Sequence, residues 1–305
     1  MPYILMVVLP ACGPNKKTNT MSYDYEKKML EIYKLEKRYT SNPLFGLQYA
    51  KWNCFFELYL NDMPAYADYS PGRSDGNRWD LTSVLSSGKQ YIKIKVFPKA
   101  EDNEMGKMIA KDAGLKIRFY KEEIDNLSRD KEFTFLNFEM PPITVDTPYL
   151  EFHLAFEANV PYKLKGWINS VDLSKEKPER LRQEVYSMYA CFEKAFASGD
   201  INQVCKMLYN KQLELSQVFY STLRENSKET VDDFRNEMNI TTGVMNHDDA
   251  RMEIFGDGKV VGLVWCKGEK RGLNGVAFET SDGGLTLYSL LLHRPQAGGP
   301  LEIIR

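Results

Sequence analysis

Apolar and polar residues alternate one by one over much of the stretch between residues 45 and 172. A clear example is the segment QYIKIKVF, in which Ile92, Ile94 and Val96 share one side of an extended chain and the intervening lysines share the other. Strict alternation is typical of strands in antiparallel sheets, which have one buried face and one solvated face. The pattern therefore predicts strands here and at Cys54–Leu60, Leu115–Phe119 and Leu150–Glu157.

Clusters of turn-forming residues separate these predicted strands. The clearest are SPGRSDGN at residues 70–77, SSG at residues 86–88 and the pair Pro141-Pro142. Glycine, proline, serine, asparagine and aspartate favour turns because they adopt or stabilise sharp backbone bends. Several short strands with such breaks predict an antiparallel β-sandwich of two sheets, covering residues 45–172.

The hydrophobic period lengthens to that of a helix after residue 172. Apolar residues recur at helical spacing over Glu179–Phe196, and Ser198-Gly199 ends that helix. Asp200 is well placed to cap the next helix, which begins at Ile201. Two further helices are predicted, one at residues 229–239 and a short amphipathic one at residues 24–39, inside an N-terminal section of residues 23–44.

Strand patterns return after Gly243, joined by glycine-rich turns that favour hairpins. Helices followed by antiparallel strands are an α+β order. The sequence thus predicts a second domain at residues 173–305, with helices packed on a curved antiparallel sheet. Its predicted strands are Ala250–Phe255, Val260–Trp265, Gly275–Thr280 and Leu285–His293.

The segment FEKAFASGDI, residues 192–201, resembles the first helical hairpin of the NTF2-like superfamily. In that family an aromatic-bearing helix, a Gly-Asp pair and a second helix precede the sheet. The resemblance covers residues 178–295 and implies a cone-shaped pocket between sheet and helices. Enzymes of the family use a pocket carboxylate or histidine as general base. The corresponding candidates here are Glu253, Asp257 and Glu279, with Tyr288 as donor, but no spacing marks any of them, so no catalytic residue is carried over.

Composition limits the class of protein. The chain has 305 residues, is 43% hydrophobic and 27% charged, and carries a net charge of −2. These values are ordinary for a folded, water-exposed protein and disfavour a nucleic-acid scaffold. Beyond the first dozen residues, no apolar run approaches the roughly 20 residues that a membrane-spanning helix needs.

Residues 9–12, Leu-Pro-Ala-Cys, resemble the lipobox of bacterial lipoproteins. They follow the apolar segment YILMVVL and precede a polar tether that extends to residue 22. In that family the chain is cut before the cysteine, which then carries acyl chains. The resemblance implies lipidation of Cys12, and Gly13 in place of aspartate implies sorting to the periplasmic face of the outer membrane. The alternative from the residues alone is a buried N-terminal strand in which Cys12 is an inert small hydrophobe.

The other four cysteines show no spacing that suggests zinc binding. Isolated cysteines on apolar faces are usually buried thiols. An exported protein also permits two disulfides, and Cys191–Cys205 is then the favoured bridge. The four residues are Cys54, Cys191, Cys205 and Cys266.

No constellation of catalytic residues stands out, and we predict no enzyme activity, no metal and no cofactor. His153, His247 and His293 lie far apart in the sequence. Each has a structural explanation that needs no catalytic role: His153 is an exposed strand residue, His247 lies in a polar turn, and His293 ends a strand. The chain also lacks the Gly-x-Ser-x-Gly elbow of many hydrolases and the phosphate-binding loop.

A polar loop is predicted at residues 70–78. It carries arginine side chains and is flanked by aromatic ones, which suit recognition of a protein or a sugar. The alternative is that its aromatic residues pack against the rim of the sandwich. Uncharacterised lipoproteins of Gram-negative bacteria resemble this overall plan, and several act as periplasmic immunity proteins. The expected function is therefore binding of a secreted toxin effector; an envelope-assembly or carbohydrate-binding role, or a pocket enzyme, is the alternative. The candidate contact residues are Tyr69, Arg73, Asp75, Arg78 and Trp79, with Tyr66 beside them.

Overall fold

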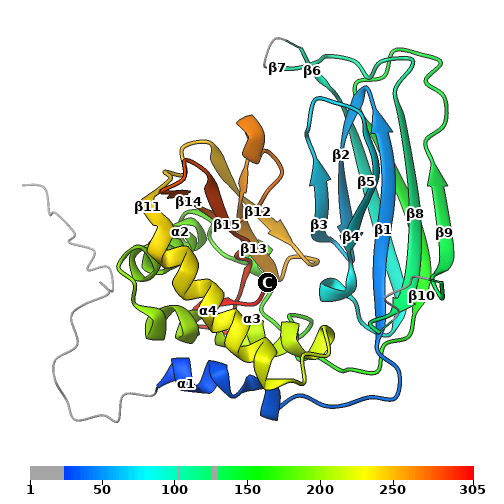
Figure 1. The fold of residues 1–305 in the computed structure, drawn as a ribbon. Coiled ribbons are helices and arrows are strands. Elements are labelled where there is room, and N and C mark those ends of the chain that lie inside the picture. The colour runs from blue at the N-terminus through cyan, green and yellow to red at the C-terminus, as the bar shows by residue number, and fades with distance from the viewer. Residues whose placement is uncertain (1–23, 102–103, 126–129) are drawn as a thin grey trace, which may run out of the picture.

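The computed structural model describes residues 24–101, 104–125 and 130–305 (Figure 1). The chain is a mixed α+β protein, and all of its paired strands run antiparallel. The expectations for residues 1–22, including the lipobox and Cys12, lie outside the described residues.

Two four-stranded sheets face each other in the first part of the chain (Figure 1). Their inner faces share one apolar core, in which Leu47, Phe56 and Phe119 are fully buried. This arrangement is compatible with the predicted sandwich. One sheet has the order β4 (Ser74–Asp80), β1 (Pro43–Trp52), β8 (Gly114–Glu123) and β9 (Phe133–Glu139); the other has β10 (Leu150–Ala158), β5 (Gly88–Pro98), β2 (Cys54–Leu60) and β3 (Met63–Asp68), and β6 (Ala100–Glu101) pairs with β7 (Glu104–Met105).

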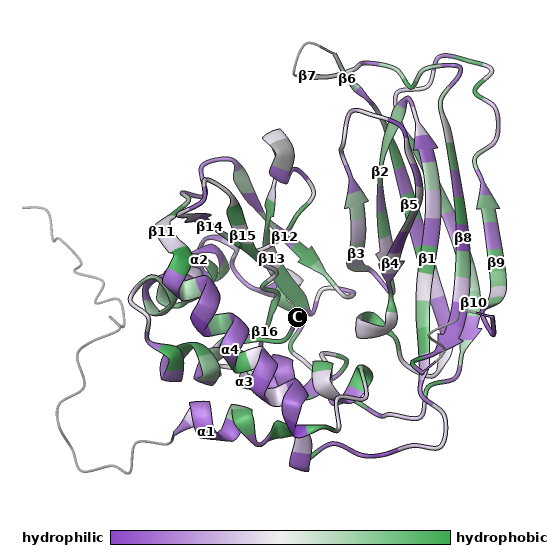
Figure 2. Cartoon of the chain, in the orientation of Figure 1, coloured by the Kyte–Doolittle hydropathy of each residue, from purple (hydrophilic) through white to green (hydrophobic). Residues whose placement is uncertain are grey.

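The four strands predicted in this part agree with β2, β5, β8 and β10, and Figure 2 shows the expected alternation of green and purple along β8. The loop predicted at residues 70–78 is wrong in its second half, because residues from Ser74 onward form β4. This strand lies at the edge of its sheet and pairs only with β1. An edge strand tolerates polar residues and glycine because half of its backbone groups face solvent.

Four α-helices are present among the described residues, and their positions agree with the predicted ones. Asp200 caps its helix as predicted, accepting a hydrogen bond of 3.0 Å from the Gln203 N–H. The first helix is shorter than predicted, since a 3₁₀ turn, Ile32–Lys34, follows it and Leu35 is exposed. The helices are α1 (Tyr25–Leu30), α2 (Pro178–Ala197), α3 (Ile201–Val218) and α4 (Arg224–Ile240).

The strands of the C-terminal half are divided between two small sheets rather than joined in one. The single strand predicted at Leu285–His293 is two strands, because the chain leaves one sheet after Tyr288 and enters the other at Leu292. The residues between them include the buried Leu290 and Leu291. The orders are β11 (Thr241–Val244), β14 (Val276–Thr280), β15 (Leu285–Tyr288), and β12 (Ala250–Phe255), β13 (Val260–Trp265), β16 (Leu292–His293), β17 (Glu302–Ile303).

The two halves of the chain touch through a shared core. Val218, Phe255 and Leu291 from the C-terminal half belong to the same apolar cluster as the facing sheets. A second cluster lies between the helices and the small sheets. The outer face of the β10-β5-β2-β3 sheet is therefore directed toward the C-terminal half, and this contact positions the site described next.

Three of the four cysteines in the folded part of the chain are free thiols, as the sequence favoured. Cys54 and Cys205 are buried free thiols, and Cys266 is a half-buried one. Since Cys205 is free, the favoured Cys191–Cys205 bridge does not form. Burial raises the pKa of the Cys54 thiol to about 11, so this thiol is protonated and unreactive at neutral pH.

Candidate functional site

The five residues expected to contact a partner do not form one surface. Arg78 and Trp79 are neighbours on β4, so their side chains leave opposite faces of the strand. Arg78 lies over the Tyr120 ring at 3.9 Å and makes ion pairs of 2.6 Å with Glu132 and 2.9 Å with Glu122. This arginine is held by its own chain on the outer face of the sheet.

Trp79 is 48% exposed and is anchored at one edge. Its indole N–H donates to the Ala65 carbonyl at 3.0 Å, and its ring lies 4.7 Å from that of Tyr66. The rim-packing alternative therefore describes Tyr66 and Trp79, although half of the indole surface remains open to a ligand.

Tyr69 has partners other than Arg73 and Asp75. The Tyr69 hydroxyl donates to Glu57 at 2.7 Å, and its ring stacks on Phe97, so it is part of the sheet surface. Arg73 and Asp75 form an exposed ion pair of 3.3 Å. Exposed pairs of this kind contribute little to binding or stability.

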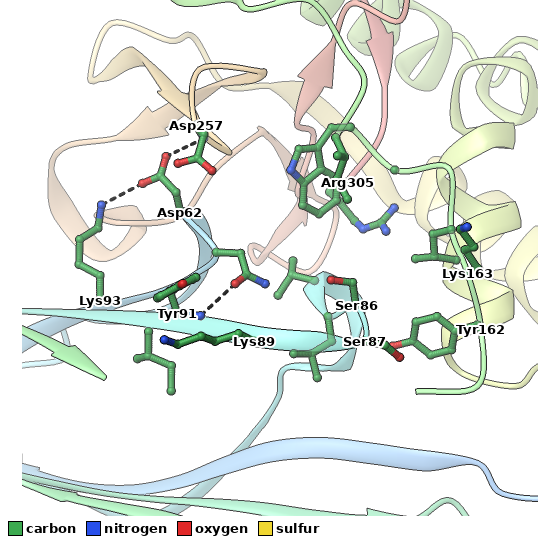
Figure 3. A pocket seen from close by; sticks show the side chains of 18 of the residues that line it. Asp62, Ser86, Ser87, Lys89, Tyr91, Lys93, Tyr162, Lys163, Asp257 and Arg305 are labelled. Atoms are coloured by element: carbon green, nitrogen blue, oxygen red, sulfur yellow. Dashed lines mark hydrogen bonds and ion pairs between the residues drawn. The ribbon is translucent and has the colours of Figure 1, made fainter. Parts of the chain in front are cut away.

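A different site emerges where the outer face of β5 meets the C-terminal half. A cavity of about 870 Å³ lies there, within the range of ligand pockets. Its floor is formed by Lys89, Tyr91 and Lys93, which alternate with the buried residues of β5 (Figure 3). We call it the β5 cleft. Its other sides come from residues 61–62, residues 84–87, residues 162–168, Asp257, His153 and Arg305.

The β2–β3 turn forms one side of the β5 cleft. Asn61 and Asp62 have φ angles of 53° and 60°, as a two-residue hairpin turn requires. The Asn61 side chain accepts a hydrogen bond of 3.0 Å from the Tyr91 N–H. The Asp62 carboxylate pairs with Lys93 at 2.9 Å and accepts from the Asp257 N–H at 3.1 Å (Figure 3). This turn therefore joins β5 to the β12–β13 turn of the C-terminal half.

Glycine is required at position 256 of the β12–β13 turn. Gly256 has a φ angle of 58°, and a Cβ there would lie 2.9 Å from the Trp167 indole nitrogen and 3.1 Å from the Met63 sulfur. A side chain at this position would separate the turn from the wall of the β5 cleft. Sequence reasoning did not single out Asn61 and Asp62, and it considered Asp257 only as a candidate carboxylate of an NTF2-like pocket. Both Asn61-Asp62 and Gly256-Asp257 are nevertheless strong turn signals.

A second wall of the β5 cleft, which includes Gly166 and Trp167, is held by a buried ion pair. Glu214 accepts from the Gly166 N–H at 2.7 Å and pairs with Arg305 at 2.9 Å. Arg305 also donates to the Ser83 carbonyl at 2.9 Å and lies 5.2 Å from the Trp167 ring centre. Burial lowers the pKa of the Arg305 guanidinium, while Glu214 acts in the opposite direction.

Two cations of the β5 cleft are available to a ligand. Lys93 is paired with Asp62 and Arg305 with Glu214, whereas Lys89 and Lys163 have no ion pair within the described part of the chain. Lys89 lies 5.4 Å from the centre of the Tyr91 ring. Tyr91, on the floor of the cleft, is 58% exposed, and Ile168, next to Trp167 in its wall, is 61% exposed. Free positive charge therefore stands beside exposed apolar surface.

The three histidines are separate, as the sequence predicted. The His153 side chain is 69% exposed and lies at the edge of the β5 cleft, 2.9 Å from Glu151. His247 contacts Glu193 at 2.5 Å, and His293 contacts the Ser170 hydroxyl at 2.7 Å. In residues 24–101, 104–125 and 130–305, no three His, Cys, Asp or Glu side chains are grouped as metal ligands.

Tyr288, the candidate donor of an NTF2-like pocket, meets none of the three carboxylates considered from sequence. Its hydroxyl donates to Glu237 of α4. Burial, and then this hydrogen bond, raise the pKa of the phenol. Glu253 pairs instead with Arg251 at 2.5 Å, and Asp257 lies at the β5 cleft. These residues do not form a general-base site around Tyr288.

Among the helices that the structure describes, none is both long and apolar enough to cross a membrane. Comparison of the chain with family models, with curated proteins and with solved structures finds no match.

Proposed function

We propose that this chain is a binding protein whose β5 cleft receives an acidic segment of a protein partner. The observation that carries the proposal is the placement of Lys89 and Lys163 beside the exposed Tyr91 and Ile168. These two cations come from separate segments and have no ion pair among the described residues. Contacts between proteins concentrate their binding energy in aromatic anchors with charged neighbours. The positive charge of these lysines would attract an acidic segment and speed its association.

The proposed partner is a secreted antibacterial effector, and the chain would act as its periplasmic immunity protein. What supports this is the resemblance of residues 9–12 to a lipobox, together with the cations and exposed apolar side chains of the β5 cleft. We further propose that Cys12 carries a lipid anchor at the periplasmic face of the outer membrane. The C-terminal half is proposed to be NTF2-like, supported by the order of three helices followed by antiparallel strands.

The test is capture of a partner by the full-length chain from envelope and secreted proteins of the native strain, read by mass spectrometry. We expect one acidic partner that is toxic when expressed alone and harmless when co-expressed with this chain. Replacing Lys89 and Lys163 together by glutamate should abolish capture, because the cleft then repels an acidic segment.

Lys111→Glu is the matched control, since Lys111 is exposed and outside the β5 cleft. This variant should retain capture. Equal capture by the double variant and the unchanged chain would show that the β5 cleft is not the contact.

A further inference from the structure

A second cavity, of about 440 Å³, lies between β3 and the C-terminal half. It shares Val84 and Arg305 with the β5 cleft but is otherwise separate. Most of its lining is apolar and comes from both halves of the chain. The apolar residues include Leu58, Ala65, Leu215, Phe255, Leu287 and Leu291.

Lys211 is the distinctive polar group of this cavity. It lies on α3, and its ammonium donates to the Ser289 carbonyl at 2.5 Å. No carboxylate forms an ion pair with it among the residues that the structure describes. An ammonium has three N–H donors, so two remain for a ligand.

The other charged groups that line the cavity already have partners. Asp80 accepts from the Thr82 hydroxyl at 2.6 Å, and Glu57 accepts from the Tyr59 and Tyr69 hydroxyls at 2.7 Å each. Arg305 is paired with Glu214 at 2.9 Å. Lys211 is therefore the one cation of this cavity, within the described chain, that lacks an anionic partner.

We propose that this cavity binds a small apolar carboxylate, with the carboxylate head on Lys211 and the apolar tail among the leucines and aromatic rings. A carboxylate supplies the missing counter-charge and accepts charge-assisted hydrogen bonds, which are stronger than neutral ones. The volume falls within the range of about 300–1,000 Å³ for small-molecule sites. Burial, and then the nearby Arg305, lower the pKa of the Lys211 ammonium to about 8 in the unliganded protein. A bound anion opposes this effect.

Calorimetry on the full-length chain tests the proposal with hexanoate, octanoate and decanoate, and with octanol as the neutral analogue. Octanoate should bind at least about tenfold more tightly than octanol, because only the acid pairs with Lys211. At pH 8, binding should take up protons, seen as a dependence of the measured heat on the ionisation enthalpy of the buffer. Lys211→Met should remove both the preference for the acid and the proton uptake.

Lys206→Met is the matched control, since Lys206 is an exposed residue of the same helix that does not line the cavity. Ala65→Leu fills part of the cavity and should weaken acid and alcohol alike, which keeps the proposal testable if Lys211→Met fails to fold. Equal affinity for octanoate and octanol, unchanged binding by Lys211→Met, or no binding of any probe would overturn the proposal.

Discussion

The fold buries the carboxyl group of Glu36 without giving it a hydrogen bond or an ion pair among the described residues. Both of its oxygens are inaccessible and have no hydrogen-bond partner among the residues that the structure describes. Burial raises the pKa of this side chain to about 7, against an ordinary value of 4.5. The native protein therefore holds a proton on Glu36 that the unfolded chain releases at lower pH.

Glu36→Gln should stabilise the protein at pH 8 and have little effect at pH 5. The folded pKa is above the unfolded one, so stability falls as pH rises from 4.5 through 7, and a neutral glutamine removes that loss. Because the side chain is only about half buried, we expect a gain of about 1–2 kcal/mol in the free energy of unfolding at pH 8. Urea unfolding at both pH values measures it; the same gain at pH 5 and pH 8 would contradict the assignment.

His293 makes the stability of the protein depend on pH in the opposite direction to Glu36. It is buried against Ser170, and burial lowers its pKa to about 4 from 6.5. Stability from the neutral ring is present above pH 6.5 and is lost as pH falls toward 4. The unchanged protein should lose about 3 kcal/mol across this window. His293→Gln should be less stable at pH 7 but should lack this part of the acid sensitivity.

His153→Gln is the control for His293, because it makes the same substitution at an exposed histidine and should retain the acid sensitivity assigned to His293. Thermal unfolding at intervals between pH 4 and pH 7 measures all three proteins. An unaltered acid profile in His293→Gln would show that this residue does not set it.

At the scale of elements, the turn between β2 and β3 shows how a short segment organises the site. Asn61 adopts a positive φ, bonds the Tyr91 N–H and donates to Gln90 at 2.8 Å. Its neighbour Asp62 reaches the β12–β13 turn. Two adjacent residues thereby fix both the floor and one side of the β5 cleft.

Asn61→Ala should destabilise the protein by about 2–4 kcal/mol, because alanine loses both side-chain bonds and is strained at positive φ. Asn61→Gly loses the bonds without the strain and should cost about 1–2 kcal/mol. Chemical unfolding of the two variants separates the two contributions. A smaller loss for alanine than for glycine would exclude backbone strain as the cause.

Edge strands and short strands were the elements least accessible to sequence reasoning. β4 contains Ser74, Asp75 and Gly76, a composition typical of a turn, and it is a strand because β1 offers its backbone a partner. Similarly, the apolar run from Leu285 to His293 has no break in its pattern, yet it is divided between two sheets. Local composition does not encode which strand is available for pairing.

At the scale of the whole molecule, the useful cavities lie where the two halves meet. The β5 cleft and the second cavity, which contains Lys211, are both lined by residues from the facing sheets and from the C-terminal half. Ligands commonly bind at such junctions, because two packed units leave concave surface between them.

The proposed membrane attachment also concerns the whole molecule, and the proposal places it on Cys12. In a full-length precursor, Cys12→Ala should abolish acyl labelling and release the chain from the membrane fraction, because the thiol is the proposed site of acylation. Metabolic labelling with a fatty-acid analogue and cell fractionation measure this. Unchanged membrane retention would contradict the lipid anchor, and Cys266→Ala is the matched control because Cys266 is a free thiol in the folded body.

The sequence by itself determined the local elements. The alternation around Ile92 predicts β5, the helical spacing before Phe196 predicts α2, and Asp200 predicts the start of α3, because each signal acts between residues a few positions apart. Tertiary structure alone decided which surfaces met. It placed Arg78 and Trp79 on opposite faces of a sheet and brought Lys89 and Lys163 to one cleft. It also left Lys211, within the described part of the chain, without a carboxylate partner in a cavity between the halves. These results depend on packing between residues far apart in the chain, and no local pattern records them.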